Sequence, residues 1–406
     1  MANNNDKKVL NVPALRFPEF TGEWMKCKFG EIATGFDYGM NAAAKPYDGQ
    51  NKYIRITDID EVSSTYNNSS IVSPDGILSE NYVVNEGDIL LARTGASTGK
   101  SYLYRKSDGK LYYAGFLIRA NVAEHNPYFV FSQLHTHRYW RWVSIMSARS
   151  GQPGINSLEY ASFPIFTTTL KEENKISSLL SLIDKRIATQ NKIIEKLQSL
   201  IKGLNDSLYK QYGNAITTSF SDLGHSYSGL SGKSSEDFGS GKPFITYLNV
   251  YSNSVVNENE YQYVRINDGE KQNIVQCGDV LFTLSSETPE EVGVGSVYLG
   301  IDEVFLNSFC FGFHIDNKEL AYPPYFSYYV SSTPFRKFIY PFAQGSTRFN
   351  LCKADFEKAS IKLPSLNNQK HIYAILNSIK GKIETEKNLL EYYTTQKQYL
   401  LRQMFI

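Results

Sequence analysis

Residues 175–208 read KISSLLSLIDKRIATQNKIIEKLQSLIKGLNDSL, and this stretch decides the architecture of the chain. Its apolar residues recur at alternating steps of four and three, which is the heptad spacing of a coiled-coil helix. The predicted seam consists of Ile176, Leu180, Ile183, Ile187, Gln190, Ile194, Leu197, Ile201, Leu204 and Leu208. At 1.5 Å per residue, a helix from Ile176 to Leu208 would be roughly 50 Å long.

A second seam of the same phase lies 196 residues further along the chain. Its positions are Ile372, Leu376, Ile379, Ile383, Glu386, Leu390, Tyr393, Lys397, Leu400 and Met404. The polar residues Gln190 and Glu386 occupy equivalent positions, where a buried polar pair can fix helix register at some cost in stability. A loose, solvent-accessible point in the seam is the alternative. Two such helices in one chain can pack against each other and hold two domains apart.

The segments that precede the two helices form an internal repeat. Five pairs of short segments match in the same order: 29–31 with 223–225, 53–56 with 244–247, 87–91 with 278–282, 125–129 with 322–326, and 150–156 with 344–350. A repeat of this length predicts two copies of one structural unit, here with mixed α and β pattern. The expected organisation is a first domain over 1–170, a helix over 171–213, a second domain over 214–365 and a helix over 366–406.

Composition excludes several classes of protein. No apolar run reaches the roughly 18 residues of a membrane span, and the N-terminus lacks a signal-peptide core, so we expect a cytoplasmic protein. The cysteines Cys27, Cys277, Cys310 and Cys352 form no metal-site or disulfide spacing. Net charge is only +1, and residues 214–365 hold 17 acidic against 11 basic residues, a balance of −6. This acidic balance is unfavourable for phosphate binding, which depends on lysine and arginine.

Two short motifs suggest enzymes but fail in detail. The stretch GASTGKS at 95–101 resembles a phosphate-binding loop, yet it is one residue too short and a strand-like SYLY follows where a helix is needed. The segments at 126–129 and 322–325 approach the Asn-Pro-Pro-aromatic motif of adenine methyltransferases, and neither is complete. Proline at a helix start is the simpler interpretation of both.

The glycine-rich loops nevertheless place suitable DNA-binding groups together. Arginine can bind guanine with two hydrogen bonds, and asparagine or glutamine can bind adenine in the same way, whereas serine and threonine suit phosphate contacts. The candidate DNA-binding residues are Arg93, Thr94, Ser97, Thr98, Lys100, Arg149, Ser150, Gln152, Asn156, Ser285, Gln344, Ser346, Thr347, Arg348 and Asn350. An ordinary polar turn explains any one of these loops, but their recurrence before each helix favours a function.

Acidic residues distinguish the second copy. Where the first has GASTGK, the second has SSETPEEVGVG, with Glu287, Glu290 and Glu291. These carboxylates could accept hydrogen bonds from cytosine amino groups. We expect them to face solvent instead.

Taken together, the chain resembles the specificity subunit of a type I restriction–modification enzyme over essentially its whole length. The resemblance is carried by the opening LRFPEFTGEW, the paired GDILLA and GDVLFT strands, the glycine-containing loops, and the helices beginning KEENKI and NNQKHI. It implies an α+β protein in which two target-recognition domains are separated by two helices that form an antiparallel coiled coil.

The resemblance also implies a function without catalysis. Each recognition domain would read one half of a two-part site in double-stranded DNA, and the helices would set the gap and bind two methyltransferase subunits. Those subunits would in turn carry endonuclease (translocase) subunits. The chain would bind no cofactor, while its partners would use S-adenosylmethionine, ATP and magnesium. A coiled-coil adaptor that scaffolds other proteins without binding DNA is the alternative, supported by the acidic second domain.

Overall fold

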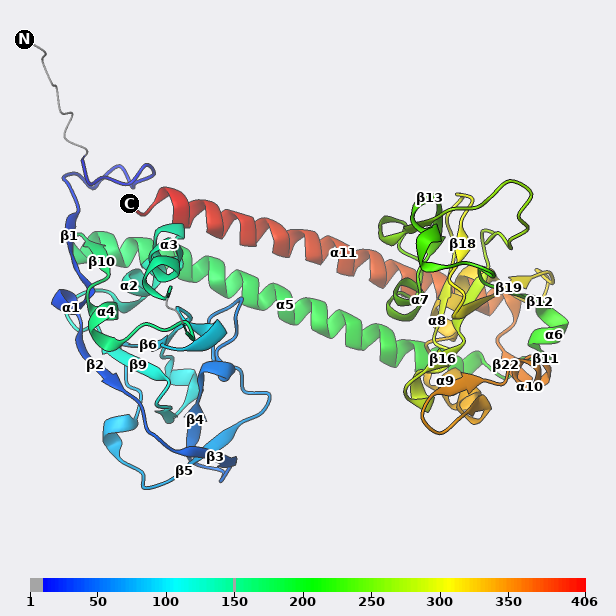
Figure 1. Ribbon diagram of the computed structural model, residues 1–406, viewed down its shortest axis with the longest axis horizontal. Coiled ribbons are helices and arrows are strands. Elements are labelled where there is room, and N and C mark those ends of the chain that lie inside the picture. The colour runs from blue at the N-terminus through cyan, green and yellow to red at the C-terminus, as the bar shows by residue number, and fades with distance from the viewer. Residues whose placement is uncertain (1–9, 149–150) are drawn as a thin grey trace, which may run out of the picture. The chain divides into compact units, whose positions relative to one another are not determined.

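The computed structural model describes residues 10–148 and 151–406, which form two compact units (Figure 1). The first unit comprises the chain up to Gln190 together with Leu389–Ile406, and the second comprises Asn191–Asn388. Each unit therefore contains one recognition domain and part of both long helices. Among the described residues, no helix is long and apolar enough to cross a membrane.

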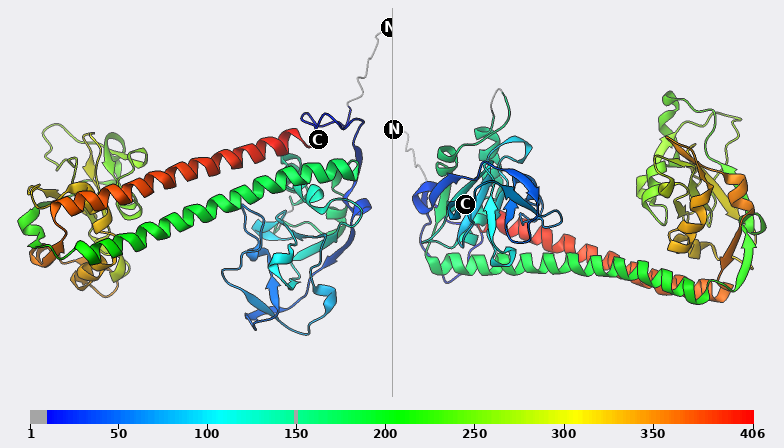
Figure 2. Two further views of the ribbon diagram at one scale, coloured as in Figure 1. Left: turned by 180° about the vertical axis from the view of Figure 1, so that it is seen from behind. Right: turned by 90° about the horizontal axis from the view of Figure 1, so that it is seen from below.

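Two long helices, α5 (Leu170–Tyr212) and α11 (Leu366–Gln403), contribute to both units. In the first unit, the start of α5 packs with the end of α11 (Figure 2), and Lys397 lies 2.7 Å from Asp184. In the second unit, Ile372 and Leu376 near the start of α11 share a core with Leu204 and other apolar residues near the end of α5. The two helices are therefore antiparallel.

Every predicted seam position of both helices is buried or half-buried, including the polar Gln190 and Glu386. The first positions of each seam are also part of the core of the adjoining domain. Ile176 and Leu180 are fully buried in the core of the first domain, and Ile372 and Leu376 in that of the second. The seams thus fasten the helices to the domains as well as to each other.

The first domain is built on a four-stranded antiparallel sheet in the order β2, β9, β6, β7. These strands are β2 (Thr34–Tyr38), β6 (Asp88–Ala92), β7 (Ser101–Leu103) and β9 (Leu117–Asn121). Smaller pairs are β1 (Met25–Lys28) with β10 (Pro164–Thr167), β3 (Ala43–Pro46) with β5 (Val72–Asp75), and β4 (Lys52–Ile54) with β8 (Leu111–Tyr113). The helices are α1 (Phe29–Ile32), α2 (Pro127–Gln133), α3 (His137–Met146) and α4 (Ser157–Ala161).

The second domain repeats this plan with the sheet β12, β19, β15, β17. These strands are β12 (Gly224–Ser228), β15 (Val280–Thr283), β17 (Gly295–Val297) and β19 (Cys310–Ile315). The smaller sheets are β11 (Ile216–Ser219) with β22 (Ser360–Leu363), the set β13 (Phe238–Ile245), β14 (Gln262–Val264) and β18 (Phe305–Leu306), and the set β16 (Ser285–Ser286), β20 (Ala343–Gln344) and β21 (Phe349–Leu351). The helices are α6 (Phe220–Leu223), α7 (Tyr247–Ser252), α8 (Phe326–Tyr329), α9 (Thr333–Ile339) and α10 (Lys353–Lys358).

A buried aspartate marks the same point in both sheets. Asp88 begins β6 and accepts a hydrogen bond from Asn121 Nδ2 at 2.7 Å, while burial raises the pKa of its carboxyl. The equivalent residue Asp279 directly precedes β15, with its Oδ1 2.6 Å from His314 Nδ1. The predicted fold class, two mixed α and β domains with an internal repeat and two long antiparallel helices, is confirmed.

The two enzyme-like motifs are structural. Strand β7 follows the GASTGK loop, so no helix N-terminus faces a phosphate there. Asn126 caps α2 by accepting hydrogen bonds from the backbone N–H groups of Tyr128 and Phe129 at 2.9 and 3.0 Å. Pro127 is the first residue of that helix, as the sequence predicted.

Candidate nucleic-acid interface

The loop after β6 and the segment before α4 lie together in the first domain. Thr94 pairs with Gly154 in an antiparallel bridge, and the Ile155 N–H donates to the Arg93 carbonyl at 2.9 Å. Two segments that are far apart in sequence, 93–95 and 153–155, are therefore neighbours in the first domain.

The candidate residues in the loop after β6 differ in whether their side chains are free to contact a ligand. Thr98 is buried and its hydroxyl donates to the Gly95 carbonyl at 2.7 Å, so it stabilises the loop. The Ser97 carbonyl accepts from the Lys100 N–H at 3.0 Å, and Lys100 Nζ lies 3.6 Å from the Glu61 carboxylate. The charge of Lys100 is thus partly balanced within the domain.

Arg93 is half-buried, and its guanidinium carbon lies 4.7 Å from the centre of the Tyr38 ring. Gln152 is exposed, and its Nε2 lies 3.1 Å from where a Cβ on Gly95 would stand. Asn156 caps α4 by accepting from the Glu159 N–H at 2.9 Å. Arg149 and Ser150 lie outside the described residues.

In the second domain, three candidate residues meet in the sheet of β16, β21 and β20. Asn350 is the register partner of both Ser285 and Gln344. Gln344 and Asn350 are exposed, whereas Ser285 is buried. Ser346, Thr347 and Arg348 form the exposed turn between β20 and β21, and the Arg348 guanidinium lies 5.6 Å from the centre of the Phe309 ring.

The hydrogen bonds correct the alignment of the two copies in this region. Leu351 N–H donates to the Leu284 carbonyl at 2.9 Å, as Ile155 N–H does to the Arg93 carbonyl. The equivalent of Asn156 is therefore Cys352, the residue before α10, and the expected match with Asn350 was wrong by two residues. Gln152 and Arg348 consequently occupy corresponding places.

Glu291 also departs from expectation. We expected its carboxylate to face solvent, but it is half-buried and accepts hydrogen bonds from Tyr251 Oη at 2.6 Å and Ser286 Oγ at 2.9 Å. The Tyr251 hydrogen bond lowers the pKa of this carboxyl. Glu287 and Glu290 are exposed, as expected.

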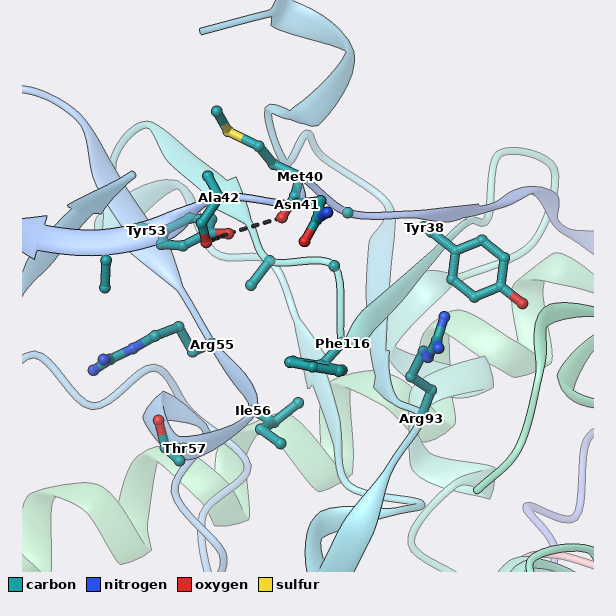
Figure 3. A pocket seen from close by; sticks show the side chains of 14 residues that line it. Tyr38, Met40, Asn41, Ala42, Tyr53, Arg55, Ile56, Thr57, Arg93 and Phe116 are labelled. Atoms are coloured by element: carbon teal, nitrogen blue, oxygen red, sulfur yellow. Dashed lines mark hydrogen bonds between the residues drawn. The ribbon is translucent and has the colours of Figure 1, made fainter. Parts of the chain in front are cut away.

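Beside the loop after β6 lies a cavity of about 650 Å³ (Figure 3). Arg93 and Tyr38 lie on one side of it and Arg55 on the other, with Phe116 between them and the Arg55 guanidinium pointing away from Phe116. The Arg55 side chain is held by Asp58 through hydrogen bonds of 2.8 Å from both Nε and Nη2. Tyr38, Arg55 and Phe116 could not be grouped from the sequence, because they come from separate strands and loops.

Comparison with known proteins identifies the family to which the two domains belong. The family model described as "Type I restriction modification DNA specificity domain" matches the chain twice, over residues 22–199 and 219–392. Two solved structures resemble this fold. One is a type I restriction–modification S subunit from M. genitalium, 15% identical, with 97% of this chain and 99% of that chain covered and a TM-score of 0.56.

The other comes from a structural study of complex assembly and conformational transition in the type I R-M system. It is 16% identical, with 94% of this chain and 97% of that chain covered and a TM-score of 0.58. Together the two family matches span most of the chain, so this protein belongs to the type I restriction modification DNA specificity family and carries two copies of its domain.

Proposed function

We propose that this chain selects the DNA sequence on which a type I restriction–modification complex acts, and that each recognition domain reads one half of a two-part site. The observation that carries the proposal is the double family match, one match for each domain. The corresponding surfaces of the two domains support the proposal, because each exposes an amide or guanidinium group at the same aligned position (Gln152 and Arg348). These groups are the ones that discriminate bases in the major groove.

Base contact, rather than phosphate neutralisation, would be the main contribution of the chain. Residues 214–365 carry a net charge of −6, and Lys100 in the first domain is close to Glu61. Since phosphate binding depends on excess lysine and arginine, partner subunits would supply much of the electrostatic attraction.

The chain would be a non-catalytic subunit. Methyltransferase subunits would dock on the long helices, endonuclease (translocase) subunits would join through them, and S-adenosylmethionine, ATP and magnesium would bind to these partners. In the first domain, the candidate DNA contacts are the exposed Gln152 together with Arg93 and Thr94. In the second domain, they are the exposed Gln344, Ser346, Thr347, Arg348 and Asn350.

The long helices would set the distance between the half-sites. α5 continues without a break from one unit into the other, and so does α11. Deleting one heptad from each helix should then shorten the gap in the recognised site. An unchanged gap in a fully assembled complex would exclude this role.

The decisive experiment maps methylated adenine across a genome by long-read sequencing, in cells that express the chain with a cognate methyltransferase subunit. The control lacks only this chain. We expect a new two-part motif with a fixed gap and one methylated adenine in each half. A stable complex that produces no chain-dependent motif would instead support the protein adaptor.

A point variant tests the assignment of halves. Arg348→Ala should relax base discrimination in one half-site by roughly tenfold or more and leave the other half intact, since a two-bond arginine–guanine contact discriminates strongly. The exposed Lys318→Ala in the same domain is the matched control. Equal loss at both halves would contradict a direct base contact by Arg348.

A further inference from the structure

The two recognition domains expose a phenylalanine at the same place. Phe116 directly precedes β9 and Phe309 directly precedes β19. The Phe116 carbonyl accepts from the Arg93 N–H at 3.1 Å, and the Phe309 carbonyl accepts from the Leu284 N–H at 2.9 Å. These matching backbone bonds show that the two residues are structural equivalents.

Both rings are unusually open to solvent. Phe116 is 57% exposed and Phe309 is 53% exposed, whereas the neighbouring Leu117 and Cys310 are 0% and 2% exposed. Leaving a phenylalanine ring in water forgoes a large favourable burial free energy. An open ring that recurs in both copies therefore indicates a surface that becomes covered by something else.

An arginine accompanies each ring, but it comes from a different part of the chain in each domain. In the first domain, Arg93 from the loop after β6 lines the cavity beside Phe116 (Figure 3). In the second domain, the residue equivalent to Arg93 is Leu284, and Arg348 from the turn between β20 and β21 lies over Phe309. Both domains thus combine an exposed aromatic ring with a guanidinium, but the two arginines stand at non-equivalent positions.

This pair of groups fits a base step of double-stranded DNA. An apolar side chain can insert between stacked bases or lie against them, and a guanidinium can bind the adjoining phosphate or a base edge. Both rings border the surfaces already described, since Arg348 lies over Phe309 and the Arg93 backbone bonds to both Phe116 and Ile155.

We propose that Phe116 and Phe309 each contact the bases of one half-site by inserting against a base step, with Arg93 and Arg348 binding beside them. The proposal rests on the proposed function and adds to it the residues that would distort or read the DNA in each half. It assigns the main apolar contact of each recognition domain.

The test uses the full chain assembled with its methyltransferase subunits, and a duplex that carries the mapped two-part motif. The fluorescent adenine analogue 2-aminopurine replaces one adenine at a time, because its emission rises when it is unstacked. We expect emission to rise in both half-sites on binding. Phe116→Ala should abolish the rise in one half-site only, and Phe309→Ala in the other only.

Affinity provides an independent readout. Each alanine variant should bind roughly tenfold or more weakly, in line with the loss of one aromatic–base contact. The dependence of affinity on salt should not change, since a neutral ring releases no counterions. Ile77→Ala and Ile301→Ala remove apolar residues that are even more open, at 93% and 95% exposed, and should leave affinity unchanged. Phe116→Trp should restore binding.

Two results would overturn the proposal while leaving the proposed function intact. One is wild-type affinity and emission in both alanine variants. The other is a failure of these variants to bind the methyltransferase subunits, because the rings would then contact protein. If the wild-type complex itself showed no sequence preference, the proposed function would fail and this inference with it.

Discussion

The two recognition domains share one framework but fasten their loops differently. In the first, the loop 93–98 ends at Gly99, whose N–H donates to the Ala92 carbonyl at 3.0 Å. In the second, the longer loop 284–292 ends at Gly293, whose N–H donates to the Thr283 carbonyl at 3.1 Å. Both glycines have a positive φ, +92° and +64°, that other residues rarely adopt.

The side chains that hold the two loops in place by hydrogen bonds are not the same. Tyr139 Oη donates to the Gly99 carbonyl at 2.8 Å in the first domain. In the second, Arg336 donates to the carbonyls of Gly293, Glu290 and Val292 at 2.6–2.7 Å. The longer loop is thus held by one side chain with several donors. Loop sequence and length can diverge between the domains because the points of attachment stay fixed.

Replacing the shared glycines should have the largest effect. A Cβ on Gly99 would stand 2.7 Å from Val143 Cγ1, and one on Gly293 would stand 2.2 Å from Ile339 Cδ1. Both substitutions also force alanine into a positive φ. We expect Gly99→Ala and Gly293→Ala each to lower the free energy of unfolding by about 3 kcal/mol, measured by urea denaturation.

Gly232→Ala is the control for this pair, because Gly232 has a φ of +66° but nothing within 4 Å of its Cβ position. It should lose only about 1 kcal/mol from backbone strain. A loss as large as that of Gly99→Ala would mean that backbone conformation, and not packing on α3 and α9, makes these positions glycine.

Removing the fastening side chains should have a smaller effect that differs between the domains. Arg336→Ala leaves three carbonyls without their donor and should cost about 2 kcal/mol, while Tyr139→Phe removes one hydrogen bond and should cost about 1 kcal/mol. Arg336→Ala should also weaken recognition of the half-site that the second domain reads and leave the other half-site unaffected. Equal costs in urea denaturation would contradict the different roles of the two residues.

Acid should destabilise the first domain through His135. Burial lowers the pKa of this imidazole to about 4, and its nitrogens lie 2.9 Å from the Phe131 carbonyl and 3.0 Å from Ser64 Oγ. The unfolded chain takes up a proton near pH 6.5 and the folded chain does not, so stability is complete above pH 6.5 and falls as pH decreases toward 4.

The expected loss is about 1 kcal/mol between pH 7 and pH 5.5. Urea denaturation followed by the fluorescence of Trp140 and Trp142, which lie in α3, reports on this domain. His135→Gln should remove most of the pH dependence. If the variant kept the full wild-type slope, another group would be responsible.

The sequence predicted the architecture well, because a heptad seam and a repeat are periodic signals that need no knowledge of contacts. Ile176 and Ile372 could be placed on helix seams by spacing alone. The candidate surface was predicted in part: segments around Arg93 and Gln152 meet, as do Ser285, Gln344 and Asn350. Whether these residues touch DNA stays a prediction.

The rest of the surface depends on long-range geometry that composition does not carry. Thr98 belongs to a polar loop, yet its hydroxyl faces inward, and only the fold decides that. From the sequence, Phe116 and Phe309 would be assigned to the core, because each directly precedes a buried strand. The signal that could have identified them is their shared position before the equivalent strands of a repeat. The two-residue error around Asn350 arose because asparagine was matched with asparagine, whereas Asn350, which pairs with Ser285, stands at the position of Gly154, which pairs with Thr94.

The core of the first unit has a consequence for the order in which the chain folds on the ribosome. Phe405 packs against Trp24 and Phe129, with ring centres 6.1 and 5.3 Å apart, and Leu400 and Met404 lie in the same cluster. The first unit, whose recognition domain is synthesised first, is therefore completed only after the second unit has been synthesised, when residues 400–405 emerge from the ribosome. The second unit is contiguous and needs no such wait. Nascent chains should thus carry an open aromatic face in the first unit until residues 400–405 have emerged from the ribosome.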